Sequence, residues 1–103
     1  MNYEQRIAEL LQTPRVYWTA LENENKVDGL VDLCKTYIKP TDHGVEVGCF
    51  SGVSSRTIAL HCGLLHCVDP WSWGAVAQAE QMFDAMLPDY PNIVKVKLPS
   101  VEA

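Results

Sequence analysis

The stretch at residues 44–52, GVEVGCFSG, constrains the fold of this chain more than any other. Apolar residues alternate with other residues up to Gly48, as they do in a β-strand, and Ser51 and Gly52 then open a helical pattern. We interpret the stretch as a strand, a tight glycine-bearing turn and the start of a helix. In an open α/β sheet, this is where the backbone can approach a nucleotide-like ligand.

The residues after this stretch predict that helices and strands continue to alternate. We expect three strands and two helices in chain order, at residues 44–50, 52–62, 64–68, 75–87 and 93–98. Gly63 is placed to cap the end of the first of these helices, and Ser54 and Ser55 to cap its beginning. Alternation with helices of this length implies parallel strands joined by right-handed crossovers. The predicted fold class is therefore α/β.

The residues before the sheet predict a helical N-terminal extension. Apolar residues recur at helical spacing over residues 2–12 and again over residues 27–38. Pro14 interrupts the first pattern, and Pro40 follows the second, because proline cannot continue a helical hydrogen-bond ladder. We expect a helical extension over residues 1–39.

The composition excludes several classes of protein. A chain of 103 residues fits one small domain. Its net charge of −5 leaves no basic footprint, so we expect no nucleic-acid partner. No apolar run approaches the roughly 18 residues that a membrane helix needs, and the N-terminus lacks the pattern of a signal peptide. We therefore expect no membrane partner and a cytoplasmic location.

The cysteines predict neither disulfides nor a metal site. All of them lie in apolar helix or strand patterns, which favours free, buried thiols: Cys34, Cys49, Cys62 and Cys67. The segment HCGLLHC at residues 61–67 offers ligand types that suit zinc. Its spacing does not suit zinc, because His66 and Cys67 alternate on a strand and point to opposite faces.

The pattern Glu46-x-Gly48-x-x-x-Gly52 is the first candidate binding motif. Gly48 lets the chain turn with no side chain between backbone and ligand, and Gly52 allows close packing where the helix starts. Glu46 places a carboxylate near the turn, which disfavours a polyphosphate and suits a ligand with a cationic group. Phe50 occupies the middle glycine position of the dinucleotide fingerprint, which counts against NAD. A purely structural turn would show the same two glycines.

Asp69 is the second candidate, 21 residues after Gly48 at the expected end of the second strand. An acidic residue at about this spacing bonds the ribose hydroxyls in α/β nucleoside-binding folds. The alternative is a turn-forming or capping aspartate before Pro70. Together, the glycine turn and Asp69 favour nucleoside binding.

The runs GVEVGCFSGVSSRTIAL, LLHCVDPWS and NIVKVKLPSVEA resemble class I S-adenosylmethionine-dependent methyltransferases, over about residues 43–103. The likeness is strongest to the small-molecule branch, whose second strand ends in an Asp followed by an aromatic residue. The resemblance implies S-adenosylmethionine as cofactor, a small-molecule methyl acceptor, and a cofactor site made of Glu46, Gly48, Cys49, Phe50, Ser51, Gly52, Asp69, Trp71 and Ser100.

The resemblance also implies a role for each part of this site. Glu46, Gly48 and the amides of residues 50–52 would surround the methionine part of the cofactor, and Asp69 would hold the ribose. Trp71 would flank the adenine, and Ser100 would contact its edge. No catalytic residue is indicated.

A complete fold of this family has seven strands, and this chain reaches three. We therefore expect a Rossmann-like partial parallel sheet with strand order 3-2-1, in which residues 40–103 form the N-terminal half of the methyltransferase domain. Methyl transfer depends on positioning the acceptor, so we expect no turnover by these residues alone. The open outer edge of the first strand predicts a homo-oligomer. Two alternatives stay open: another Rossmann-type nucleotide-binding domain, and a non-catalytic truncated or regulatory fragment.

Overall fold

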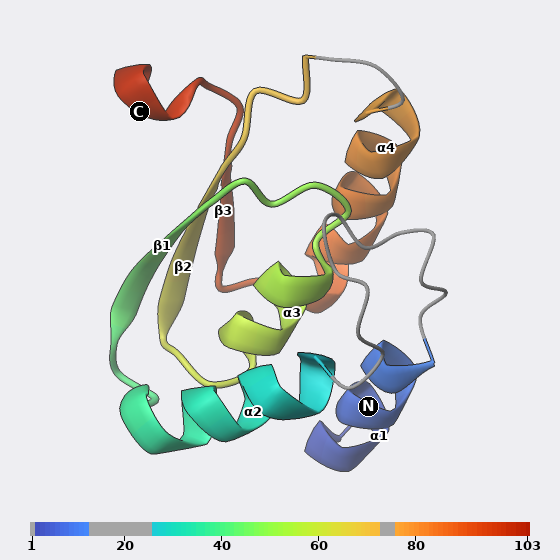
Figure 1. Cartoon of the computed structure of the whole chain (residues 1–103), viewed down its shortest axis with the longest axis vertical. Helices are drawn as coiled ribbons and strands as arrows, with labels where there is room; N and C mark the ends of the chain where they lie inside the picture. Colours follow the sequence, from blue (N-terminus) through green and yellow to red (C-terminus); the bar gives the residue numbers. More distant parts are fainter. Residues whose placement is uncertain (1, 13–25, 73–75) are drawn as a thin grey trace.

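The computed structural model describes residues 2–12, 26–72 and 76–103, which contain an open parallel sheet with helices on one face (Figure 1). Strands β1 (His43–Val47), β2 (Leu64–Val68) and β3 (Ile93–Val96) lie in the order β1-β2-β3, and both pairings are parallel. Helices α3 (Val53–Ala59) and α4 (Val76–Met86) make the two crossovers. This confirms the predicted α/β class, the three-stranded Rossmann-like sheet and its strand order.

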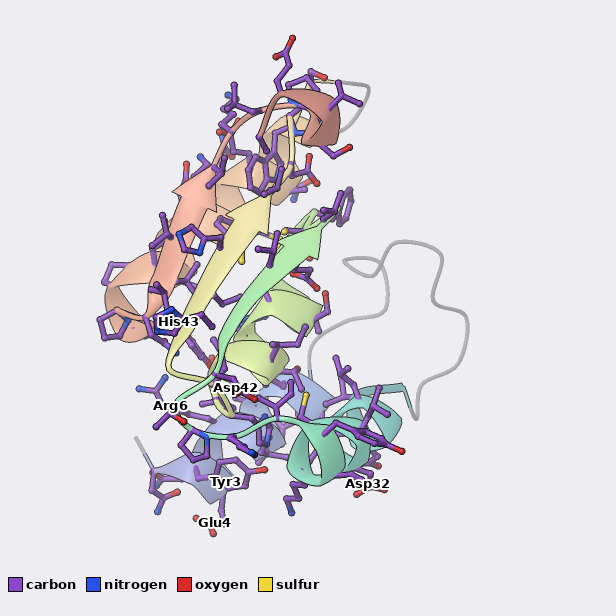
Figure 2. The ribbon with its side chains drawn as sticks, turned by 90° about the vertical axis from the view of Figure 1, so that its left-hand side faces the viewer. Tyr3, Glu4, Arg6, Asp32, Asp42 and His43 are labelled. Atoms are coloured by element: carbon purple, nitrogen blue, oxygen red, sulfur yellow. The ribbon has the colours of Figure 1, made fainter. Side chains whose placement is uncertain are left out.

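The predicted N-terminal helices form α1 (Tyr3–Leu11) and α2 (Lys26–Tyr37), which lie at the end of the sheet where the strands begin (Figures 1 and 2). A capping box starts α1, in which the Asn2 side chain accepts a hydrogen bond from the backbone N–H of Gln5 and the Gln5 side chain accepts one from the backbone N–H of Asn2. Pro14 lies outside the described residues. One buried cluster joins both helices to the start of α3: Leu10, Val27, Val31 and Val53.

The register of the strands separates the two faces of the sheet. Alternate residues, beginning with Gly44 and Leu65, face α3 and α4, where the main core gathers around Phe83. The other residues face away from these helices, and Val45 and Val47 on β1 are 69% and 62% exposed. Figure 2 views the sheet from this second side, on which no described α-helix lies. As predicted, no described strand pairs with the outer edge of β1; association through that edge stays a prediction.

Two of the predicted strands and the first crossover helix are shorter than expected. The first strand ends at Val47 instead of residue 50, because the backbone turns at Gly48 and Phe50, which have φ angles of 82° and 50°. The third strand ends at Val96, before the 3-10 helix at Ser100–Glu102. Another 3-10 helix, Leu87–Asp89, follows α4.

The predicted caps of the first crossover helix are wrong at both ends. Helix α3 ends at Ala59, with Leu60 as its C-terminal cap residue, so Gly63 lies beyond the helix. Gly63 is instead needed for a close approach, since a Cβ atom there would lie 2.9 Å from the carbonyl oxygen of Pro40. At the beginning, Gly52 is the cap residue and no side chain caps the helix.

Asn92 supplies the hydrogen bonds that the end of α3 needs. Its side-chain amide donates to the carbonyl oxygens of Ala59 (2.8 Å) and Cys62 (3.1 Å), which ties α3 to the start of β3. We expect Asn92→Ala to lower the free energy of unfolding by about 1–2 kcal/mol, because these carbonyls lose their partner. Denaturant unfolding measures this loss. Asn92→Asp keeps the size of the side chain but removes both donors, so it should lower the free energy of unfolding by a similar amount. An Asn92→Asp variant with unchanged stability would contradict the explanation.

Candidate functional site

The loops that follow β1 and β2 are hydrogen-bonded to each other at the carboxyl end of the sheet. The carboxylate of Asp69 accepts the backbone N–H of Phe50 (3.1 Å) through Oδ2 and that of Trp71 (2.8 Å) through Oδ1. The indole N–H of Trp71 in turn donates to the carbonyl oxygen of Phe50 at 2.8 Å. We call residues 48–52 and 69–71 the loop pair. The structure thus brings together the glycine turn and the aspartate that the sequence singled out 21 positions apart.

Both loops contain backbone in a strained conformation. Among the described residues, Phe50 (φ 50°) and Trp71 (φ 44°) are the two non-glycine residues with positive φ. Such a conformation is uncommon for bulky residues and costs on the order of 1–2 kcal/mol each. Strain of this kind gathers at ligand-binding sites, where the surrounding contacts maintain it. Here, the hydrogen bonds through Asp69 maintain it, so the loop pair is the candidate functional site.

Gly48 and Gly52 have different tasks in the first loop. Both have positive φ, 82° and 88°. A Cβ atom on Gly48 would meet nothing within 4 Å, so the backbone is accessible there, as a ligand site requires. A Cβ atom on Gly52 would lie 2.9 Å from the Phe83 ring and 3.0 Å from Cε of Met86. This bears out the expectation that Gly52 allows close packing where the helix starts.

Trp71 lies in the core. Its side chain is 5% exposed, and its ring lies 4.9 Å from the Phe83 ring, centroid to centroid, at a tilt of 53°. The ammonium of Lys95 lies over the ring, 5.0 Å from its centroid. With these contacts, Trp71 positions the backbone of the loop pair. Contact between Trp71 and an adenine stays a prediction.

Glu46 is held by the two serines of the first turn of α3, a contact that the sequence interpretation missed. The hydroxyl of Ser54 donates to Oε2 of Glu46 at 2.5 Å, and the hydroxyl of Ser55 donates to Oε1. The prediction that the serines cap the helix is therefore wrong. They fix its first turn to β1 instead. The tight turn could have indicated this contact, because it brings the first turn of α3 back against the face of β1 that α3 covers.

Two other predicted site residues, Cys49 and Ser51, lie buried in the first loop. The thiol of Cys49 donates to the carbonyl oxygens of Glu46 (3.3 Å) and Val68 (3.6 Å). Ser51 is 2% exposed. Both side chains are buried and help to hold the loop backbone in position. Direct contact of either side chain with a cofactor stays a prediction.

Ser100 lies apart from the loop pair. It is exposed and borders a hollow of about 290 Å³ on the face of the sheet that α3 and α4 leave uncovered. The residues that line this hollow belong to the strands and the chain end: Val45, Val47, His66, Val68, Val96, Ser100 and Ala103. None of them belongs to the loop pair, so the structure does not join Ser100 to the other predicted residues. A second hollow, of about 440 Å³ between α1, α3 and α4, is lined by none of the predicted site residues.

Comparison with solved structures identifies proteins that share this arrangement. The structure of 23S rRNA methyltransferase ErmE matches with a TM-score of 0.62 and 16% sequence identity, over 82% of this chain and 32% of that chain. Coclaurine N-methyltransferase bound to N-methylheliamine and SAH matches with a TM-score of 0.54 and 15% identity, over 94% of this chain and 37% of that chain.

The chain has a methyltransferase fold. It spans about a third of the length of the two methyltransferases that it matches. No protein-family model matches the chain, and no curated protein matches it in sequence. The assignment of a methyltransferase fold therefore rests on structural similarity alone. The similar structures do not assign a role to any residue of the loop pair.

The comparison corrects the predicted partners. We expected a small-molecule acceptor and no nucleic acid, but ErmE, which shares the fold, is a 23S rRNA methyltransferase. The exclusion of nucleic acid was wrong because it took net charge as the criterion, and the small-molecule acceptor is not confirmed. RNA is bound by local groups of cations, so a net charge of −5 over 103 residues does not by itself exclude it. No described helix is long and apolar enough to cross a membrane.

Proposed function

We propose that this chain binds S-adenosylmethionine and forms the cofactor-binding part of a methyltransferase. The observation that carries the proposal is the loop pair. A buried aspartate, 7% exposed, holds two strained loops together at the carboxyl ends of adjacent parallel strands. In open α/β sheets, ligands bind outside the carboxyl ends of the strands.

Asp69 is the residue proposed to hold the ribose. Each carboxylate oxygen accepts one backbone N–H, from Phe50 or Trp71, and a carboxylate oxygen has a second acceptor position. Those remaining positions suit the two vicinal hydroxyls of a ribose. The two backbone amides fix the direction in which the Asp69 carboxylate points, so these hydrogen-bond acceptors are positioned before the ligand arrives.

Gly48 and Glu46 are proposed to form the methionine end of the site. The space beside Gly48 is open, so a ligand can approach the backbone there. The half-buried carboxylate of Glu46 adds negative charge next to the turn, which favours the cationic sulfonium and ammonium groups of the cofactor. Ser54 and Ser55 hold this carboxylate in place. When bound, the cofactor supplies the methyl group.

Titration calorimetry with S-adenosylhomocysteine and with NAD tests the proposed function. We expect one S-adenosylhomocysteine per chain and no heat from NAD, because Phe50 lies where a pyrophosphate would need glycine. Binding of NAD alone would indicate another Rossmann-type nucleotide domain. Binding of neither ligand by the folded chain would favour a fragment that keeps the fold without the function.

A further inference from the structure

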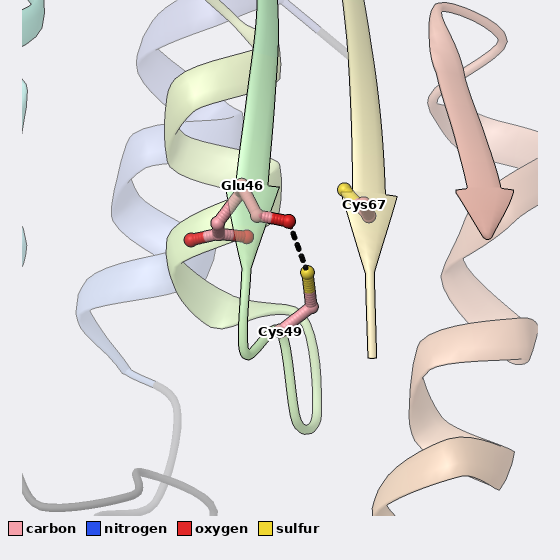
Figure 3. Close-up of side chains that lie close together, drawn as sticks. All are labelled: Glu46, Cys49 and Cys67. Atoms are coloured by element: carbon pink, nitrogen blue, oxygen red, sulfur yellow. Dashed lines mark hydrogen bonds between the residues drawn. The ribbon is translucent and has the colours of Figure 1, made fainter. Parts of the chain in front are cut away.

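A carboxylate and two thiols lie close together near the carboxyl ends of β1 and β2, on the face of the sheet that α3 covers (Figure 3). Glu46 on β1 is the direct register partner of Cys67 on β2. Cys49 follows Glu46 by three residues, and the tight turn brings its sulfur back beside them. One carboxylate oxygen and the two Sγ atoms all lie within 4.8 Å of one another. Among the described residues, this is the one group of three potential metal ligands.

The dimensions of this group suit a tetrahedral zinc ion. Zinc binds thiolate sulfur at about 2.3 Å and carboxylate oxygen at about 2.0–2.2 Å, which separates neighbouring ligand atoms by about 3.5–3.8 Å. Because the ligand atoms lie within 4.8 Å of one another, they need to approach by about 1.3 Å at most. Two of the ligands are also fixed by the backbone, since Glu46 and Cys67 lie on paired strands.

The surroundings suit a bound cation as well. Cys49 and Cys67 are 3% and 0% exposed, whereas Glu46 is half-buried and gives access from the outside. Ser54 and Ser55 donate hydrogen bonds to the Glu46 carboxylate, as outer partners do for carboxylates that bind metal ions. The two oxygens keep further acceptor positions for a metal ion.

Zinc binds cysteine as the thiolate, so an ion held by Cys49 and Cys67 would release the protons of both thiols.

We propose that Glu46, Cys49 and Cys67 bind one zinc ion between β1, β2 and the turn after β1. The site is distinct from the segment HCGLLHC as a whole, from which it takes Cys67 alone. A bound ion would connect the glycine turn to β2 directly. Glu46 belongs to both proposals, and a zinc ion there would offset the negative charge that the proposed function assigns to it. The zinc test uses no nucleotide, so its failure and the failure of the proposed function are distinguishable.

Titration of the reduced, metal-free chain with cadmium tests the site, because cadmium takes the ligands of zinc and its bonds to thiolates absorb in the ultraviolet. We expect the absorption to saturate at one cadmium per chain and to disappear when zinc displaces the probe. Cys67→Ser should abolish the absorption. Ser55→Ala removes an outer partner and should weaken binding by about 10–100-fold.

Cys62→Ser is the matched control, since Cys62 is a free cysteine outside the group. It should leave both the stoichiometry and the affinity unchanged. Absorption that survives Cys67→Ser, or that depends on Cys62, would overturn the proposal. If Cys67→Ser does not fold, Glu46→Gln serves instead, with binding expected to weaken by at least about 10-fold. Unchanged binding in folded Glu46→Gln would exclude the three-ligand site.

Discussion

Replacing Gly52 by alanine is expected to lower the free energy of unfolding by about 2–4 kcal/mol. The φ of 88° at Gly52 costs on the order of 1–2 kcal/mol for a residue with a side chain. The added Cβ would lie 2.9 Å from the Phe83 ring and 3.0 Å from Met86, which are both buried, so overpacking adds about 1–3 kcal/mol. Denaturant unfolding monitored by tryptophan fluorescence measures the loss.

Gly29→Ala is the matched control for Gly52→Ala. Gly29 lies within α2, and a Cβ atom there meets nothing within 4 Å. Alanine is the better helix former, so this change should raise the free energy of unfolding by about 0.5–1 kcal/mol. If both variants shift stability equally, the explanation from backbone conformation and close packing at Gly52 is wrong.

Replacing Asp69 by alanine is expected to destabilise the loop pair and to abolish cofactor binding. The backbone N–H groups of Phe50 and Trp71 lose a charged acceptor, and both residues keep their strained φ angles. We expect a loss of about 2–4 kcal/mol in the free energy of unfolding, since hydrogen bonds to charged groups contribute about 1.5–3 kcal/mol each and are not additive. Calorimetry with S-adenosylhomocysteine, below the unfolding temperature of the variant, measures the binding.

Asp69→Asn separates structure from binding. The amide keeps one acceptor oxygen for a backbone N–H but loses the charged pair that is proposed to accept both ribose hydroxyls. We expect S-adenosylhomocysteine affinity to fall by about 5–150-fold, which corresponds to about 1–3 kcal/mol. Asp32→Asn, at an exposed position on α2, should leave affinity unchanged. Full affinity in folded Asp69→Asn would remove Asp69 from the cofactor site, whatever its effect on stability.

The sheet could be predicted from the sequence because strands, helices and turns each show a local pattern of apolar and turn-forming residues, and these patterns recur along the chain. Strand β2 was predicted with its observed bounds, since a short apolar run with one histidine lies between Gly63 and Asp69-Pro70. The end of β1 was not predicted, because it depends on the backbone conformations at Gly48 and Phe50. Bulky residues in a left-handed conformation leave no mark in a hydropathy pattern.

The candidate site was predicted in part. The pairing of the glycine turn with Asp69 followed from their spacing, and the structure joins them through the N–H of Phe50. The packing of Trp71 against Phe83 did not follow, since it requires the position of α4 relative to the loop. Ser100 was placed in the site by resemblance; it borders the uncovered face of the sheet, and its contact with an adenine stays a prediction.

The sequence by itself determined the order of strands and helices, the glycine turn and the position of Asp69 at the end of β2. These features depend on residues that are near one another in the chain. The tertiary structure alone decided that Ser54 and Ser55 hold Glu46, and that the thiols of Cys49 and Cys67 meet beside it. The register of β1 against β2 brings Glu46 next to Cys67, and strand pairing sets that register between residues 21 positions apart in the sequence.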